Sequence, residues 1–296
     1  MLNRAPIFIN GFNRGGTNLL QFLITAHPEV CLLGRETHEL FYGKSDEPIQ
    51  KWFDRLICLP VVIATRQHMF YVSNLEERNH IPPLIGRYID WLFYRSKIGS
   101  VMNRVKDDQG TKYTRAELKA ARLLCKNTNG VIFTSKELQQ MYPDAVFISL
   151  VRNGLALCEG YIRRGSSAGD FGKMYEQICQ KMIKDETSLC NYHIVHFEDM
   201  LNDPIAFVED IYAKVNLDLT QVKKFGLKAK SSMNKDGVRS LMFGATEGER
   251  VWTSLEKLGD HLRADVDDNQ IGRLRPEEID EFLKFAGGSM KYFGYL

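Results

Sequence analysis

A glycine-rich turn near the start of the chain constrains the fold more than any other feature. Residues 6–21, PIFINGFNRGGTNLLQ, run from a short apolar segment through the turn into a second apolar pattern. The first segment, residues 7–9, has the composition of a strand buried on both faces, and the apolar residues at 19, 20, 22 and 23 recur at helical spacing. The stretch therefore predicts the strand–turn–helix unit of an α/β protein.

The turn itself predicts an anion-binding site. Gly11 and Gly16 end a G-x-x-x-x-G spacing, in which missing Cβ atoms let the backbone turn sharply and direct its N–H groups at an anion. The positive end of the following helix adds to this attraction. A nucleoside-triphosphatase loop would continue with Lys and a magnesium-binding Ser or Thr. Here Thr17 and Asn18 follow and the cation is Arg14, which favours an anion held without a metal and weighs against a kinase or triphosphatase.

Beyond the turn, strand and helix patterns alternate as a parallel sheet requires. The further expected strands are residues 30–33, 123–125, 144–151 and 193–197, and helices are expected at 172–189 and 276–292. A chain of 296 residues with 44% hydrophobic content can bury a full core. We predict a single domain over residues 1–296, with a mostly helical insertion at 40–118 and a flexible cover segment at 223–275.

Composition narrows the class of protein further. Lys and Arg total 39 against 37 Asp and Glu, a net charge of +2, so a general nucleic-acid-binding surface is not expected. No apolar run approaches the roughly 18 to 20 residues of a membrane span, and no signal-peptide pattern precedes the first strand, so we expect a soluble, cytoplasmic protein. Six cysteines show no metal-ligand spacing. Cys31 and Cys125 each precede a candidate site segment and could be neighbours, bonded or free.

Several segments resemble one family, in the family's order. GFNRGGTNLL resembles the 5′-phosphosulfate loop of sulfotransferases that use 3′-phosphoadenosine 5′-phosphosulfate (PAPS), and HPEVCLLGRETHEL resembles a segment of tyrosylprotein sulfotransferases and their bacterial relatives. LCKNT, the run from MYPDAVF to YIRR, HIVHFEDMLNDP and DDNQIGRLRP resemble later family segments, so that the likeness covers about two thirds of the chain. It implies the P-loop-like sulfotransferase fold, a three-layer α/β arrangement of a parallel sheet flanked by helices.

The resemblance also implies PAPS as the donor, 3′,5′-ADP as the product and no metal. It makes Glu36 the base that takes the acceptor's proton, with His38 as the alternative because a free imidazole titrates nearer neutrality. Arg14 and Lys126 would stabilise charge on the leaving phosphate. The other cofactor-binding positions that it implies are Asn13, Gly15, Gly16, Thr17, Asn18, Arg152, Gly160 and Arg273. The acceptor would be a hydroxyl or amine of a carbohydrate, lipid-linked or peptide molecule.

One position departs from the family pattern. A serine usually stands eight residues after the arginine that corresponds to Arg152, where it binds the 3′-phosphate, but Gly160 occupies this position. The lost hydrogen bond is worth about 1.5–3 kcal/mol. Gly160 therefore favours an alternative, a catalytically impaired nucleotide-binding or scaffold protein of the same fold. The retained Glu36, Arg14 and Lys126 oppose it.

Three further groups of residues each admit two interpretations. Arg273 and Arg275 fold back over the nucleotide or form a solvated basic loop, with neither favoured. Arg163 and Arg164 face an acidic acceptor or end a helix whose C-terminus attracts cations, and we favour the helix end. His193, His196 and Glu198 could suggest a metal site, but strand alternation next to a helix start favours a structural role.

Overall fold

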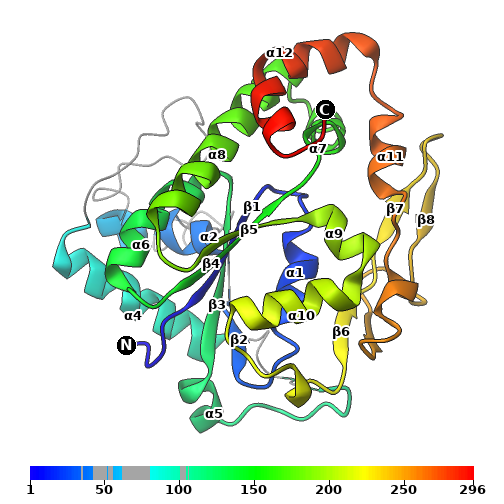
Figure 1. Ribbon diagram of the computed structural model, residues 1–296. Helices are drawn as coiled ribbons and strands as arrows, with labels where there is room; N and C mark the ends of the chain where they lie inside the picture. Colours follow the sequence, from blue (N-terminus) through cyan, green and yellow to red (C-terminus); the bar gives the residue numbers. More distant parts are fainter. Residues whose placement is uncertain (35, 43–51, 53–55, 62–80, 101–104, 106) are drawn as a thin grey trace.

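A five-stranded parallel sheet, in the order β2-β3-β1-β4-β5, forms the centre of the computed structural model (Figure 1). The structure describes residues 1–296 except 35, 43–51, 53–55, 62–80, 101–104 and 106. Each neighbouring pair of strands is parallel, which confirms the predicted α/β sheet flanked by helices. The strands are β1 (Ile7–Gly11), β2 (Val30–Leu32), β3 (Arg122–Thr128), β4 (Val146–Val151) and β5 (Tyr192–His196).

Helices cover both faces of this sheet because the central strand buries both of its faces. Ile7 and Ile9 pack into one apolar cluster, and Phe8 packs into another on the opposite face, as the two-residue alternation of a strand requires. The first face is covered by α1 (Thr17–Ile24), α9 (Phe197–Asn202) and α10 (Pro204–Lys214). The second is covered by α4 (Pro83–Gly99), α5 (Arg115–Ala120) and α6 (Ser135–Met141).

A third apolar cluster lies beyond the carboxyl ends of β1 and β4. There α7 (Gly154–Ile162), α8 (Ala168–Ser188) and α12 (Pro276–Tyr292) pack together with the short helix η3 (Asn129–Thr134). Figure 1 shows α12 lying along α8 at one end of the molecule. The bounds of α12 match the sequence prediction, whereas α8 starts four residues before the predicted 172 because the Ser167 side chain accepts a hydrogen bond from Asp170 N and caps it.

Strand β3 continues past the predicted residues 123–125 and includes Lys126 and Thr128. Polar residues fit inside this buried strand because their side chains form hydrogen bonds with other buried polar side chains. Asn127 Nδ2 donates to Asn10 Oδ1 at 3.1 Å, and Asn10 Nδ2 donates to Ser135 Oγ at 3.0 Å. A buried polar group that is hydrogen-bonded avoids the cost of an unsatisfied one. Lys126 is thus held within the sheet rather than in a loop after it.

The predicted cover segment at 223–275 has regular structure, which corrects its expected lack of pattern. It contains the antiparallel pairs β6 (Phe225–Lys228) with β9 (Arg250–Thr253) and β7 (Ser231–Met233) with β8 (Arg239–Leu241). The helical turns η4 (Leu219–Gln221) and η5 (Leu258–His261) flank these pairs, and α11 (Val266–Ile271) follows and lies beside β7 and β8 (Figure 1). Strands of three or four residues carry too little periodicity to be recognised from sequence alone.

The predicted helical insertion at 40–118 is described only in part. Its helix candidate near 84–94 lies within α4, and α2 (Thr37–Tyr42) overlaps the start of the insertion. Most of the candidate at 48–58 falls outside the described residues. No helix in the described part of the chain is long and apolar enough to cross a bilayer. The division into one domain stays a prediction.

Cys31 and Cys125 lie on the adjacent strands β2 and β3, where Cys31 is in register with Leu123. Both thiols are free and buried. Burial raises the pKa of the Cys31 thiol to about 11, so it stays protonated near neutrality and has little thiolate character.

Candidate active site

The turn between β1 and α1 has the conformation that the glycine spacing predicts. Arg14 and Gly16 both adopt positive φ angles, 70° and 89°, and Gly15 N donates to Phe12 O at 3.0 Å. A Cβ on Gly16 would lie 2.3 Å from a ring carbon of Phe197, so only glycine fits. Gly16 is the N-cap of α1 and supplies no side-chain bond to the helix. The first backbone N–H groups of α1 therefore face the turn, where they can bind an anion.

Glu36 and Lys126 form an ion pair at the carboxyl edge of the sheet. Lys126 Nζ also donates to Asn18 Oδ1 at 2.6 Å, which ties the pair to the first turn of α1. Glu36 lies just before α2, and its Oε2 accepts a hydrogen bond from Thr128 Oγ1 at 3.3 Å and lies 3.3 Å from His38 Nδ1. The Glu36 carboxylate is thus held by two residues of β3 and by His38, and Lys126 links it to α1.

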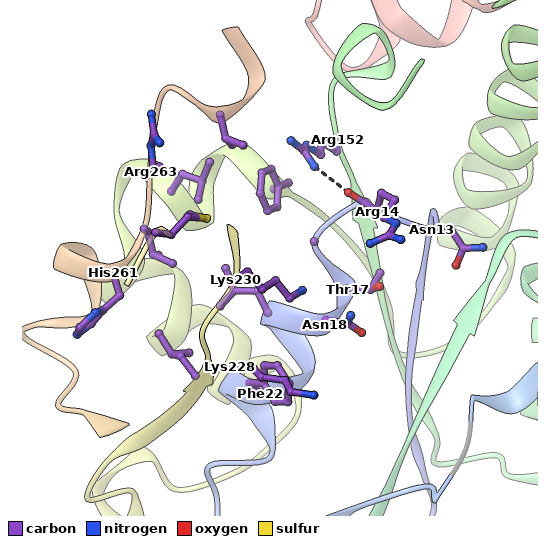
Figure 2. A pocket seen from close by; sticks show the side chains of 18 of the residues that line it. Asn13, Arg14, Thr17, Asn18, Phe22, Arg152, Lys228, Lys230, His261 and Arg263 are labelled. Carbon is purple, nitrogen blue, oxygen red and sulfur yellow. Dashed lines mark hydrogen bonds between the residues drawn. The ribbon is translucent and has the colours of Figure 1, made fainter. Parts of the chain in front are cut away.

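A cleft of about 620 Å³ opens in front of the turn (Figure 2). Its walls come from the turn, from the ends of β3 and β4, from the end of α7, from α9 and from the 223–275 segment. The sequence-predicted residues that line it are Asn13, Arg14, Gly16, Thr17, Asn18, Glu36, Lys126 and Arg152.

A second cavity of about 390 Å³ adjoins the cleft. Its lining includes Gln21, Leu33 and Glu39, which do not line the larger cleft. The two hollows share the lining residues Asn18, Phe22, Glu36, Lys126, Lys228 and Lys230. The Glu36–Lys126 ion pair therefore stands at the border between two adjoining spaces, each large enough for part of a reactant.

Arg152 ends β4 at the same edge, but most of its hydrogen-bonding capacity is already used. Its Nε and Nη2 both donate to Asp267 Oδ1, its Nη2 also donates to Gln270, and its Nη1 donates to Arg14 O at 2.8 Å (Figure 2). Its guanidinium lies 4.3 Å from the ring centroid of Phe197. A guanidinium has five N–H groups, so these contacts leave one for a ligand.

Behind Arg152, Glu198 joins the end of the chain to the start of α7. Tyr295 Oη donates to Glu198 Oε2 at 2.9 Å, and Asn153 N donates to Glu198 Oε1 at 2.8 Å. Burial, together with the hydrogen bond to Asp267, raises the pKa of Glu198 to about 7. His196 Nδ1 lies 3.1 Å from Tyr295 Oη, so His196 and Glu198 have structural partners. No metal-binding group of three His, Cys, Asp or Glu occurs within the described ranges.

Gly160 and Arg273 do not line the cleft, whereas Arg164 does. Arg164 Nη1 donates to Gly160 O at 2.8 Å, and a Cβ built on Gly160 would lie 3.8 Å from that nitrogen. The Arg164 guanidinium thus lies across the glycine. Arg273 is occupied elsewhere, since its Nε pairs with Glu159 at 2.9 Å and its Nη1 donates to Asn234 O at 2.7 Å.

Arg275 caps α12 through Glu278, and Arg163 follows the end of α7 and pairs with Glu159. The preferred helix-end interpretation therefore describes Arg163, and it also fits Arg164, whose Nη1 donates to Gly160 O in the last turn of α7. Arg164 lines the cleft as well. Burial, followed by the nearby charges of Arg14 and Arg163, lowers the pKa of Arg164.

Sequence reasoning also missed the nitrogen-bearing side chains that the 223–275 segment brings to the cleft. They are Lys228, Lys230, His261 and Arg263. Lys228 and Lys230 stand two residues apart, a spacing that puts both side chains on one side of an extended segment. That signal was present in the sequence, but the segment was not expected to contain strands.

Comparison with known proteins identifies one family for this chain. A family model described as "Sulfotransferase family" matches residues 6–221. Mouse sulfotransferase SULT7A1 complexed with PAP is 11% identical, with 97% of this chain and 89% of that chain covered and a TM-score of 0.44. The sulfotransferase domain of the Synechococcus PCC 7002 olefin synthase is 15% identical, with 74% and 76% covered and a TM-score of 0.42. Sulfotransferase STF1 of Mycobacterium tuberculosis H37Rv is 18% identical, with 73% and 68% covered and a TM-score of 0.39. A search of curated proteins gave no match.

Proposed function

The chain belongs to the sulfotransferase family, whose model spans residues 6–221, and from that premise we propose that it transfers a sulfuryl group from PAPS to a hydroxyl or amine. One observation carries the proposal. The Glu36–Lys126 ion pair stands at the border of two adjoining cavities, directly beside the anion-binding turn. A donor in one cavity and an acceptor in the other would meet at this pair.

The charge of the larger cleft fits PAPS. A 3′-phosphate and a 5′-phosphosulfate together carry roughly four negative charges near neutrality. In the part of the chain that the structure describes, four cations of the cleft have no carboxylate partner: Arg14, Arg164, Lys228 and Lys230. The volume of about 620 Å³ is also within the usual range for a small-molecule site. The donor set is basic and rich in N–H groups, which suits phosphate oxygens without a metal.

PAPS supplies an activated sulfuryl group on a phosphate that leaves with an electron pair. Glu36 is the base that takes the acceptor's proton as the new bond to sulfur forms. Once protonated, Glu36 no longer balances Lys126, so the lysine charge becomes available to the leaving phosphate. Arg14 and the N–H groups at the start of α1 stabilise the same phosphate from the side of the turn. Catalysis therefore rests on positioning and on fixed positive charge, as in phosphoryl transfer.

For the 3′-phosphate we propose two arginines. Arg152 has one N–H group left after its contacts with Asp267, Gln270 and Arg14, which makes it a weak ligand alone. Arg164 lies across Gly160 and so supplies charge and N–H donors where the family pattern has a hydroxyl. This substitution favours a functional nucleotide site over the impaired alternative.

We place the acceptor in the cavity of about 390 Å³ next to Glu36. The acceptor would be a carbohydrate, a lipid-linked molecule or a peptide. The likeness of the HPEVCLLGRETHEL segment to tyrosylprotein sulfotransferases favours a peptide hydroxyl among these. Both apolar and polar side chains line this cavity, including Phe22, Leu32 and Gln21, as an amphipathic acceptor would need.

Thermal-shift measurements with three nucleotides test the donor assignment. We expect 3′,5′-ADP to raise the melting temperature more than 5′-AMP does, because only 3′,5′-ADP carries the 3′-phosphate, and a ligand stabilises the folded state according to its affinity. ATP with magnesium serves as the control for a kinase-like site. Stabilisation by ATP with magnesium alone would overturn the sulfotransferase mechanism proposed for this site.

A further inference from the structure

Lys230 reaches the border of the two cavities from the side opposite the glycine-rich turn. It lies between β6 and β7, and both Lys228 and Lys230 line the cleft and the second cavity. Figure 2 shows the Lys230 side chain extending toward Thr17 and Asn18 at the start of α1, while Lys228 lies beside Phe22. Lys230 thus faces the place where donor and acceptor would meet.

The backbone around Lys230 is held in place on both sides. Ala229 N donates to Glu249 O at 2.7 Å, Gly248 N donates to Ala229 O at 2.9 Å, and Met242 N donates to Lys230 O at 2.9 Å. These bonds join the segment to neighbouring chain on both flanks. The backbone that carries Lys230 is therefore fixed, and its side chain reaches the cleft from a defined point.

The charges around Lys230 require an anion. Although Lys230 keeps part of its surface exposed, partial desolvation, followed by the nearby charges of Lys126, Arg14 and Lys228, lowers the pKa of its ammonium. No carboxylate among the described residues pairs with Lys230. Lys126 has Glu36 as its partner, whereas Lys230 and Lys228 at the border of the two cavities, and Arg14 in the larger cleft, have no carboxylate partner among the described residues. Like charges held together in this way favour a bound anion between them.

We propose that Lys230 is a third catalytic cation, which donates a hydrogen bond to an oxygen of the transferring sulfuryl group. This role rests on the proposed sulfuryl transfer. In that step the bond from sulfur to the 5′-phosphate oxygen breaks and its electron pair stays on the phosphate. A bond from sulfur to the acceptor oxygen forms, and the acceptor's proton goes to Glu36. The sulfuryl oxygens carry negative charge throughout, and Lys230 contacts them from the side opposite Arg14.

Binding measurements without an acceptor test this role, because 3′,5′-ADP lacks the sulfuryl group that PAPS carries. Isothermal titration gives the dissociation constants of both nucleotides, and the change in their ratio between the unaltered protein and a variant reports the loss of contacts to the sulfuryl group. We expect Lys230→Met to reduce the preference for PAPS over 3′,5′-ADP by about tenfold, as for one lost charge-assisted hydrogen bond. The affinity for 3′,5′-ADP should stay within about threefold, and Lys230→Arg should restore much of the preference.

Lys223→Met is the matched control, since Lys223 is exposed in the same segment and lines neither cavity. An unchanged preference in the folded Lys230→Met protein would overturn the proposal, and so would an equal loss of affinity for both nucleotides. Thermal melting establishes that the variant is folded, and Lys230→Arg provides a second variant. If the unaltered protein bound neither nucleotide, the proposed donor itself would be wrong, an outcome distinct from failure of the Lys230 role.

Discussion

Replacing Arg152 with methionine should destabilise the protein strongly, because it leaves a buried carboxylate without its partner. Arg152 is 5% exposed and Asp267 is 9% exposed, and Asp267 Oδ1 accepts two hydrogen bonds from the guanidinium. Removing one member of a buried ion pair costs about 3–5 kcal/mol. The substitution also removes the bond to Arg14 O and the contact with the Phe197 ring. The loss is a large part of the roughly 5–15 kcal/mol that stabilises a typical domain.

Urea unfolding followed by circular dichroism measures this loss as a change in the free energy of unfolding. The double variant Arg152→Met, Asp267→Asn should recover part of the stability, because the uncompensated charge is then gone. Arg4→Met is the control, since Arg4 pairs with Glu29 at the surface and exposed pairs contribute about 0–1 kcal/mol. A loss below about 1 kcal/mol in Arg152→Met, or strictly additive effects in the double variant, would refute the ion-pair reasoning, which rests on the penalty for a buried unpaired charge.

Three further outcomes are expected. Glu36→Gln should abolish turnover of PAPS with an acceptor while 3′,5′-ADP binding by titration stays nearly intact, and equal loss of both would remove Glu36 as the base. Arg164→Gln should weaken 3′,5′-ADP binding by roughly ten- to a hundredfold but leave 5′-AMP binding unchanged. Adding Gly160→Ser to this variant should recover part of the 3′,5′-ADP affinity. Equal effects on both nucleotides would exclude the contact between Arg164 and the 3′-phosphate. Burial raises the pKa of Glu198 in the folded state to about 7, above the ordinary glutamate value of about 4.5. Between these pH values the folded state binds more protons, so the stability contributed by this group falls as pH rises. Urea unfolding from pH 5 to 8 should show that fall in the unaltered protein and a smaller one in Glu198→Gln, and identical pH profiles would contradict it.

The residues at the strand ends were predictable because the carboxyl ends of parallel strands share one edge of the sheet. Arg14, Lys126 and Glu36 each follow or end an apolar segment that reads as a strand, and the structure brings them to one cleft. Arg152 reaches the same cleft by the same rule, but its pairing with Asp267 had no local signal. Asp267 lies 115 residues further along the chain, and only packing places it there.

Two predictions about arginine side chains fell short of the structure for one shared reason. Arg273 was expected to be able to reach the nucleotide, yet Glu159 holds it at the back of α7. Arg164 was taken as a helix-end cation, and its Nη1 does donate to Gly160 O near the end of α7, but the same side chain also lines the cleft. In both cases the direction of a long, flexible side chain was decided by a partner, and no spacing in the sequence encodes that choice.

By itself, the sequence determined the parallel sheet, the glycine turn and the positions of Arg14, Lys126 and Glu36 at the turn and the strand ends. It could do so because apolar periodicity and glycine spacing are local properties of a chain. Tertiary structure alone decided that the 223–275 segment forms two small antiparallel pairs of strands and that Lys230 lines the cleft. It also decided that Asp267 accepts hydrogen bonds from the Arg152 guanidinium. Pairing of such short strands depends on contacts between distant residues, and a charged side chain points where the folded chain offers it an opposite charge or an open space.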